Sequence, residues 1–281
     1  MQTVVDAGSL RAAVRGWRAQ GHNIGFVPTM GNLHDGHFAL LKLARSRCAR
    51  VVASIFVNPT QFGPGEDFAR YPRTLAQDQA GLAEHGCDLV FAPDVATMYP
   101  FGADASVRVH VPQLGDTLEG AHRPGHFDGV ATVVAKLFDL VQPDVAVFGQ
   151  KDFQQWRVVE RMVADLSLPI AIVAAPTRRD ADGVALSSRN QYLSAGERAR
   201  APLLYATLQQ MRALHAQGHA RAALEQAALA RLQRGGFTPD YVAIRRAADL
   251  AEPGAGERDG LVALAAARLG GTRLIDNLAL D

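Results

Sequence analysis

The sequence predicts an α/β fold, in which a mostly parallel sheet domain is followed by a smaller α+β domain. In the first two thirds of the chain, short β-rich runs alternate with helical periods, a pattern that favours right-handed βαβ units and a parallel sheet. The best helical period is Phe127–Val141, whose apolar residues fall on one stripe at helical spacing. The pattern changes after about Pro176, so we predict domains at 1–176 and 177–281.

The elements of the first domain follow from these runs in chain order. The predicted strands are Ile24–Val27, Val51–Val57, Asp88–Phe91, Val107–Val111, Val145–Phe148 and Ile170–Ala174. The predicted helices are Gly36–Cys48, Thr74–His85, Phe127–Val141 and Asp152–Leu166.

The second domain begins with a polar hairpin or loop at Arg178–Asn190, which turns at Asp182 and Gly183. Two helices rich in Ala, Leu and Arg are predicted next, at Ser194–Gln217 and Ala220–Arg234. Three β-like runs then complete the domain, at Tyr241–Ile244, Leu261–Ala266 and Arg273–Ile275.

Composition excludes several classes of protein. Apolar residues make up 48% and charged residues 20% of the 281 residues, which is ordinary for a globular protein. The formal net charge of +1 gives no basic surplus for nucleic acid. We expect Cys48 and Cys87 to be buried thiols, because their spacing suits no metal site. The N-terminus lacks a signal-peptide core and no apolar run approaches the ~20 residues that span a bilayer, so we expect a cytoplasmic protein with no membrane partner.

The first polar segment that could carry chemistry is Pro28–His37, between a predicted strand and its helix. Ligands of parallel sheets bind at the carboxyl ends of the strands. Gly31 and Gly36 allow the backbone to approach a phosphate, and the helix that follows offers N–H groups. His34 and His37 could place imidazoles against that phosphate. A plain turn with surface histidines is the alternative, which the combination of strand, glycines and histidines disfavours.

Two further segments follow predicted strands. In Phe56–Phe62, Pro59 ends the strand, and the amides Asn58 and Gln61 could bind a small hydroxylated or amine-bearing substrate; a turn with self-satisfied amides is equally compatible with the residues. In Phe148–Gln155, Gly149 permits close approach and Lys151 offers a charge for phosphate. Asp152 could cap the helix or bind ribose hydroxyls.

The remaining polar segments are a loop and a helix start. Ser187, Ser188 and Arg189 lie in a loop and could bind a triphosphate, although a solvated turn explains them as well in isolation. Arg123 precedes the helix at Phe127 and adds another cation. No polar segment indicates a site by itself. The argument for a common site is that all of these segments would converge at one edge of a parallel sheet.

The motifs PTMGNLHDGH, FVNPTQF, YPRT, RPGHFDGV, GQKDFQQ and LSSRN occur in this order along nearly the whole chain. In these motifs the sequence closely resembles the pantoate–β-alanine ligase family of the HxGH nucleotidyltransferases. The resemblance implies a Rossmann-like domain at 1–176 that binds ATP and pantoate, a smaller C-terminal lid domain at 177–281, and a homodimer. It also implies ATP-dependent condensation of pantoate with β-alanine to pantothenate, in the biosynthesis of coenzyme A, through a pantoyl-adenylate, with Mg²⁺ accompanying ATP.

The resemblance also assigns residues by position. His37 would be the catalytic acid, acting with His34, Lys151 and Arg189. Gln61 and Gln155 would bind pantoate, with Asn58 near the acyl group and Arg123 near the phosphates. The implied ATP-binding residues are Met30, Gly31, Asn32, Leu33, His34, Asp35, Gly36, His37, Gly149, Gln150, Lys151, Asp152, Arg178, Leu186, Ser187, Ser188 and Arg189.

The motifs leave the adenine contact and the metal ligands open. Arg178 stands where the family usually has an apolar residue beside adenine, so the contact is made either by the main chain or by a stacked guanidinium. No metal ligands are identified; Mg²⁺ would be held mainly by phosphates and water, with Asp78 a loose candidate.

Three other functions fit the residues less well. An adenylyltransferase that passes AMP to another small acceptor, a phosphate, would need cations in place of Gln61 and Gln155. A tRNA synthetase fragment would need a basic face and a lysine-rich loop, and the sequence has neither. A regulatory module without catalysis would be expected to have lost some of the residues His34, His37, Lys151 and Arg189, which are all present.

Overall fold

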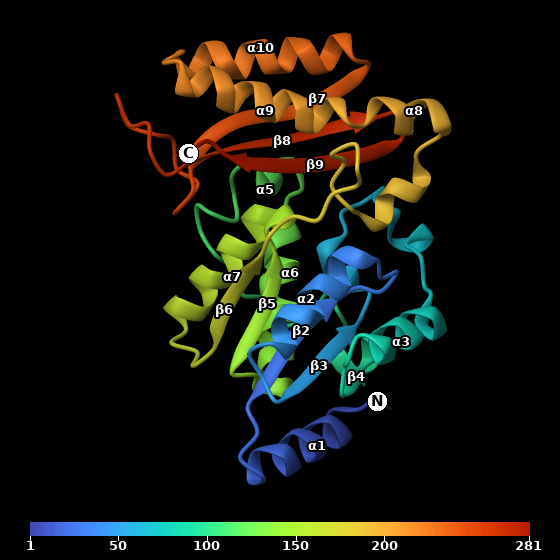
Figure 1. Cartoon of the computed structure of the whole chain (residues 1–281). Helices are drawn as coiled ribbons and strands as arrows, with labels where there is room; N and C mark the ends of the chain where they lie inside the picture. Colours follow the sequence, from blue (N-terminus) through green and yellow to red (C-terminus); the bar gives the residue numbers. More distant parts are fainter. The chain divides into compact units, whose positions relative to one another are not determined.

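The computed structural model describes all residues, Met1–Asp281. Six parallel strands form the sheet of the first unit of the chain (Figure 1). This unit comprises Met1–Gln150 and Val158–Pro176, and the second comprises Lys151–Arg157 and Thr177–Asp281. The strands, in the order in which they lie in the sheet, are β1 (Gln2–Val4), β4 (Leu89–Phe91), β3 (Arg50–Ile55), β2 (Ile24–Thr29), β5 (Val145–Gly149) and β6 (Ala171–Ala175).

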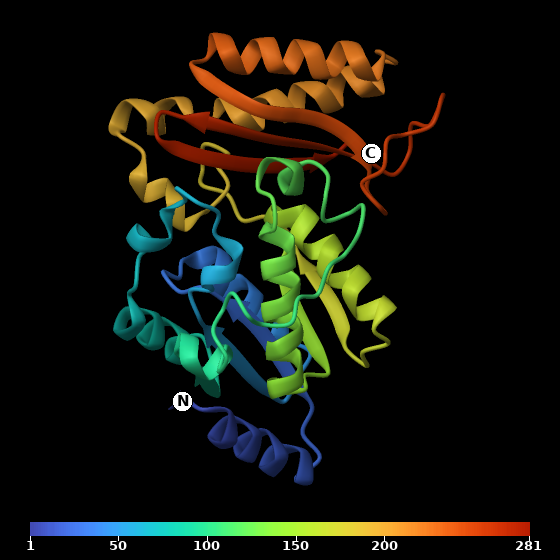
Figure 2. The same ribbon diagram turned by 180° about the vertical axis from the view of Figure 1, so that it is seen from behind.

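Helices cover both faces of this sheet. Helix α2 (Asp35–Arg45) lies on one face (Figure 1) and α6 (His126–Val141) lies on the other, which Figure 2 shows from behind. The buried side chains of α2, Leu41 and Ala44, pack on strand residues such as Val27 and Val51 in one apolar core. The remaining helices are α1 (Ala7–Ala19), α3 (Leu75–Glu84), α4 (Val95–Met98), α5 (Glu119–His122) and α7 (Phe153–Asp165), with 3₁₀ turns η1 (Pro59–Gln61), η2 (Asp67–Arg70) and η3 (Gln150–Asp152).

The strand order reverses beside β2. From β2 the chain proceeds through β3 and β4 toward one edge, and it then returns to β5 on the other side of β2. A crevice for ligands forms where the order of parallel strands reverses in this way. The loops after β3 and β2 are therefore neighbours of the end of β5 at Gly149, and these two loops carry two of the predicted polar segments.

The second unit contains an antiparallel sheet in the order β7 (Phe237–Arg246), β8 (Leu261–Leu269) and β9 (Thr272–Ala279). Helices α9 (Leu203–Ala216) and α10 (Arg221–Arg234) lie side by side on one face of this sheet (Figure 1). Leu208 of α9, Leu232 of α10 and Ile244 of β7 meet in a single buried core. The predicted fold class is confirmed: a parallel α/β sheet is followed by a smaller α+β unit.

Two predicted elements are wrong. Val107–Val111 is not a strand; Val107 is 85% exposed, and the Val109 N–H donates to the Thr132 hydroxyl of α6 instead of to another strand. The predicted helix Ser194–Gln217 is broken into α8 (Ala195–Arg200) and α9, because Pro202 at the break cannot continue the hydrogen-bond ladder.

The prediction also omitted β1 and α1 at the N-terminus. Helix α1 begins at a normal signal, since the Asp6 side chain caps it by accepting from the Ser9 N–H. None of the helices combines the length and the hydrophobicity needed to cross a membrane. The two cysteines are free and buried, as predicted, and burial raises the pKa of Cys87 to about 11.

Candidate active site

The loop between β2 and α2 places two histidines at the start of a helix. Gly31 and Asn32 adopt successive left-handed conformations, with φ of 85° and 51°, and turn the backbone sharply after β2. His34 is the N-cap of α2, and its Nδ1 accepts a hydrogen bond from the Gly36 N–H at 3.1 Å. His37 reciprocates, because its Nδ1 accepts from the His34 N–H at 3.3 Å. The two rings lie 4.2 Å apart between centroids.

These contacts determine where each neutral imidazole carries its proton. A neutral ring that accepts at one nitrogen is protonated at the other. Because both histidines accept at Nδ1, both carry the proton on Nε2. The start of α2 can therefore present two N–H donors, together with the positive end of the helix dipole, to an anion such as phosphate.

Gln61 follows β3 and has its side-chain amide oriented by neighbours. Its Oε1 accepts from Asn58 Nδ2 at 3.0 Å, and its Nε2 donates to the Met30 sulfur at 3.2 Å. Asn58 is in turn oriented by the Tyr99 hydroxyl, which donates to Asn58 Oδ1 at 2.8 Å, and by the Gly129 carbonyl, which accepts at 3.2 Å. The structure thus brings three predicted residues, Met30, Asn58 and Gln61, into one network.

Arg123 is held between two carboxylates. It makes a bidentate pair with Glu66, at 2.7 and 2.6 Å, and a second ion pair with Glu119 at 3.2 Å. It also donates to the Gln61 carbonyl at 3.3 Å and to His126 Nε2 at 3.0 Å. These contacts connect Arg123 to the loop that carries Gln61.

His126 is a neutral link in this network. Its Nδ1 lies 2.8 Å from the Gln61 carbonyl and Nε2 faces the Arg123 guanidinium, so Nδ1 donates and Nε2 accepts. Desolvation, followed by the nearby charge of Arg123, lowers the pKa of His126 from 6.5 to about 4. The ring therefore stays uncharged throughout the physiological range.

We expect this histidine to make the fold acid-sensitive. In the unfolded chain His126 takes up a proton below pH 6.5, whereas in the folded chain it does so only near pH 4. The free energy of unfolding therefore falls as the pH falls through this window. The shift corresponds to a loss of up to about 3 kcal/mol. Urea unfolding of the protein and of His126→Gln, at pH 7.5 and pH 5, measures it. Gln donates and accepts at similar positions without titrating, so an equal pH dependence in both proteins would contradict the assignment.

In the second unit, two predicted segments are held by the last strand. Asn277 of β9 donates from Nδ2 to the Lys151 carbonyl at 2.9 Å. Its neighbour Asp276 accepts both arms of Arg179, at 2.6 and 2.8 Å, and is almost fully buried. Arg179 also stacks on the Tyr205 ring, 3.6 Å from its centroid. Adjacent residues of β9 thus anchor the backbone at Lys151 and the start of the 178–189 segment.

The predicted residues of the second unit belong to this framework. The Lys151 ammonium donates to Asp152 Oδ1 at 3.3 Å. The Arg178 carbonyl accepts from the Leu186 N–H at 2.9 Å, which closes the loop that leads to Ser187. The Ser187 hydroxyl accepts from the Arg189 N–H at 3.3 Å and caps η4 (Ser188–Tyr192). Arg178 is exposed, and Gln155 is partly exposed in the first turn of α7.

No group of three or more His, Cys, Asp or Glu side chains is placed to hold a metal ion. Asp78, the loose candidate, directs both carboxylate oxygens at the chain itself: Oδ1 accepts from the Leu33 N–H, and Oδ2 from the Asn32 N–H and the Thr74 hydroxyl. Its contacts are those of a residue that positions the loop.

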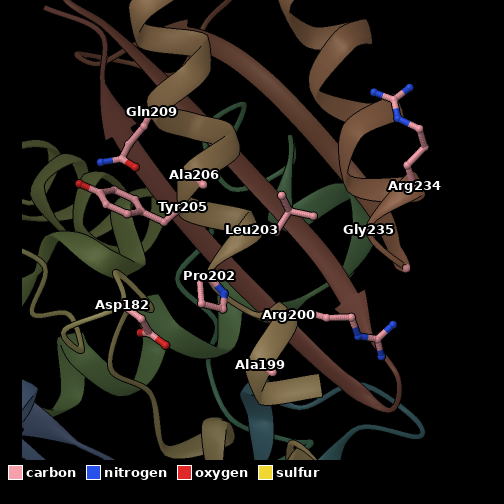
Figure 3. Close-up of a pocket in the computed structure, with 11 residues that line it drawn as sticks. Asp182, Ala199, Arg200, Pro202, Leu203, Tyr205, Ala206, Gln209, Arg234 and Gly235 are labelled. Carbon is pink, nitrogen blue, oxygen red and sulfur yellow. The ribbon is translucent and has the colours of Figure 1, made fainter. Parts of the chain in front are cut away.

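A cavity of about 550 Å³ in the second unit contains none of the predicted site residues. It lies beside the start of α9, lined by Leu203 and Tyr205 (Figure 3). The cations at its border, Arg200 and Arg234, extend away from each other. These two cations therefore do not converge on a single ligand position in the cavity.

Sequence reasoning missed several residues that orient the predicted ones. Tyr99 and Glu119 belong to no segment that was singled out, and His126 and Gly129 were noted only as members of the motif RPGHFDGV. One signal was available: Gly129 interrupts an otherwise apolar helix, and a glycine there indicates close approach of another backbone.

Comparison with known proteins agrees with these features. The family model described as pantoate-beta-alanine ligase matches residues 2–279. A pantothenate synthetase of Xanthomonas oryzae pv. oryzae (strain MAFF 311018) is 56% identical over 278 residues, which cover 99% of each chain. The relative from Xanthomonas axonopodis pv. citri (strain 306) is 55% identical over the same length.

Solved structures show the same similarity. The crystal structure of pantothenate synthetase from Thermus thermophilus matches with a TM-score of 0.93 and 50% identity, covering 100% of this chain and 99% of the other. A pantoate-beta-alanine ligase from Francisella tularensis, solved in complex with β-γ ATP and β-alanine, matches with a TM-score of 0.84 and 31% identity, covering 100% and 98%. The chain therefore belongs to the pantoate–β-alanine ligase family.

Proposed function

We propose that this chain is an ATP-dependent ligase that condenses pantoate with β-alanine to pantothenate, releasing AMP and pyrophosphate through a pantoyl-adenylate. The observation that carries the proposal is the Met30–His37 loop, which directs two Nε2–H imidazoles from a helix start in a chain that matches the family over 2–279. The Francisella relative, solved with β-γ ATP and β-alanine, supports a nucleotide and an amino acid as two of the substrates.

In the first step, a pantoate carboxylate oxygen attacks the α-phosphorus of ATP, and the bond from that phosphorus to the bridging oxygen of pyrophosphate breaks. A carboxyl group with a pKa of about 4 is already ionised at neutral pH, so no general base is needed. The barrier arises from bringing two anions together and from charge on the departing pyrophosphate. We propose that His34, His37, Lys151 and Arg189 lower it by preorganised electrostatics, with His37 donating from Nε2.

In the second step, the amine of β-alanine attacks the acyl carbon of the adenylate. The carbon–oxygen bond to AMP breaks, the amide forms, and the amine nitrogen loses a proton. We propose that Gln61 and Gln155 hold the hydroxyl-bearing pantoyl group. The fixed orientation of the Gln61 amide, with Asn58 at its oxygen and Met30 at its nitrogen, supports this role. A neutral amide also favours an uncharged acceptor body over the phosphate acceptor of an adenylyltransferase.

The remaining assignments extend this proposal. ATP contacts are assigned to Met30–His37, Gly149–Asp152, Arg178 and Leu186–Arg189, with Asn58 near the acyl group and Arg123 near the phosphates. Residues 1–176 then form the ATP- and pantoate-binding domain and 177–281 the lid. The substrate is MgATP, whose metal is held by phosphate oxygens. We place the enzyme in the cytoplasm as a homodimer.

An AMP-release assay tests the function. Purified protein with MgATP, pantoate and β-alanine should form AMP and pantothenate, identified by mass spectrometry, and omission of β-alanine should stop turnover. Pantoate alone should drive exchange of labelled pyrophosphate into ATP, which reports the adenylate. ATP binding with no exchange and no AMP would refute pantoate as the substrate.

A further inference from the structure

The loop that carries the two histidines makes a left-handed turn. Asn32 has a φ of 51° directly after Gly31 at 85°. Glycine and asparagine are the residues that adopt this conformation most readily. Successive N–H groups in such a turn point to one side and form a concave site for an anion.

Asp78 of α3 fills that concave site with a carboxylate of the chain itself. Its Oδ1 accepts from the Leu33 N–H at 2.8 Å, and its Oδ2 accepts from the Asn32 N–H at 2.9 Å. The hydroxyl of Thr74, the N-cap residue of α3, donates to Oδ2 at 3.1 Å. Asp78 is 3% exposed. These three donors therefore take the place of the water molecules that the carboxylate loses on burial.

The carboxylate is in close contact with the loop. A Cβ added to Gly31 would lie 3.0 Å from Asp78 Oδ2 and 3.1 Å from Ile55 Cγ2. The loop is also tied to the sheet, since the Gly31 N–H donates to the Thr29 hydroxyl at 3.2 Å, and that hydroxyl donates to the Ser54 carbonyl at 2.7 Å. Asp78 holds the next two residues of the loop, Asn32 and Leu33, and Leu33 directly precedes His34.

We propose that Asp78 is a positioning residue for adenylate formation, which sets the course of the backbone into His34 and thereby the direction of the His34 and His37 Nε2–H groups. The inference rests on the proposed function of those histidines. Asp78 acts through the loop and contacts neither substrate nor metal. A displacement of about 1 Å in a catalytic group can cost on the order of 10²-fold in rate.

Asp78→Asn tests this role. The amide keeps the shape but has one acceptor oxygen, so one of the two loop N–H groups would face an NH₂ group. We expect pantoate-driven pyrophosphate exchange at saturating MgATP to fall by on the order of 10²-fold, with no change in the Mg²⁺ concentration for half-maximal rate. Asp139→Asn, which alters an exposed carboxylate paired with Arg11, is the matched control and should keep the parent rate.

A spectroscopic measurement separates this inference from the proposed function. In ¹⁵N-histidine-labelled protein, the ring signals of His34 and His37 should shift in Asp78→Asn and keep their positions in Asp139→Asn, whatever the substrate is. No exchange by the parent protein would refute the function alone. Unchanged ring signals and rate in Asp78→Asn would overturn the positioning role, and so would a loss that excess Mg²⁺ restores, because that is the behaviour of a metal ligand.

Thr74→Val provides a milder variant if Asp78→Asn does not fold. It removes the hydroxyl that steadies Oδ2 and leaves the carboxylate in place. We expect a fall in exchange rate of about 3- to 10-fold, equivalent to losing one hydrogen bond of about 1 kcal/mol, again with an unchanged Mg²⁺ requirement. A parent-like rate in this variant would contradict the proposal.

Discussion

Alanine in place of Lys151 is expected to slow adenylate formation by on the order of 10²–10³, the effect of removing one preorganised charge from a developing anion. The Lys151 side chain is 20% exposed and has Asp152 as a partner at 3.3 Å, while its backbone is anchored separately by Asn277. The substitution therefore removes the charge and leaves the main chain in place. Single-turnover formation of the adenylate, with melting temperature recorded in parallel, measures the effect.

Two variants serve as controls for Lys151→Ala. Lys42→Ala removes an exposed lysine from the last turn of α2 and should retain the parent rate. Lys151→Arg retains a charge in a different shape and should recover only part of the rate, because a planar guanidinium does not replace a point charge. If Lys151→Ala reacted at the parent rate, the proposed role for this residue would be abandoned.

The second large effect is expected from Gly129→Ala in α6. A Cβ at this position would lie 2.2 Å from the Thr60 carbonyl oxygen and 2.7 Å from the Gln61 N. Both are backbone atoms, so η1 must move away from α6 and carry Gln61 with it. We expect a fall in kcat/KM for pantoate on the order of 10²-fold. Overpacking lowers the free energy of unfolding by about 1–3 kcal/mol. The higher helix propensity of alanine offsets about 1 kcal/mol of that loss.

Gly16→Ala is the matched control for Gly129→Ala. Gly16 lies within α1, and nothing lies within 4 Å of the Cβ that would be added. The same change should therefore stabilise the protein by up to about 1 kcal/mol and leave turnover unaltered. Urea unfolding measures the stability of both variants, and steady-state kinetics measure their turnover. A Gly129→Ala protein with parent kinetics would contradict the prediction and show that η1 tolerates the shift.

The residues proposed to meet substrate were visible in the sequence, whereas the residues that orient them were not. His34 and His37 stand out because the three-residue spacing, the glycines and the preceding strand form a local pattern. Asp78 reaches the loop from more than forty residues away, and at the level of sequence it was only a loose candidate for binding Mg²⁺. The role of His126 was likewise not visible in the sequence, because its low pKa depends on burial and on the nearby charge of Arg123.

The Val107–Val111 segment shows the limit of periodicity. Its alternation of valines with polar residues predicts a half-buried strand. A strand, however, needs a neighbour with unpaired backbone groups, and here the Val109 N–H is taken by Thr132 of α6. The residue pattern describes the side chains of a segment and says nothing about whether a partner strand is within reach.

By itself the sequence determined the class of fold, most of the strands and helices, and the loops that carry the family's motifs. These features depend on residues close together along the chain. The tertiary structure decided the strand order, with β3, β2 and β5 adjacent, the proton positions on His34 and His37, and the clamp of Asp78 on the loop. Each of these is a matter of hydrogen bonds whose geometry exists only after the chain has folded, because the conformational entropy of distant segments must first be overcome by packing.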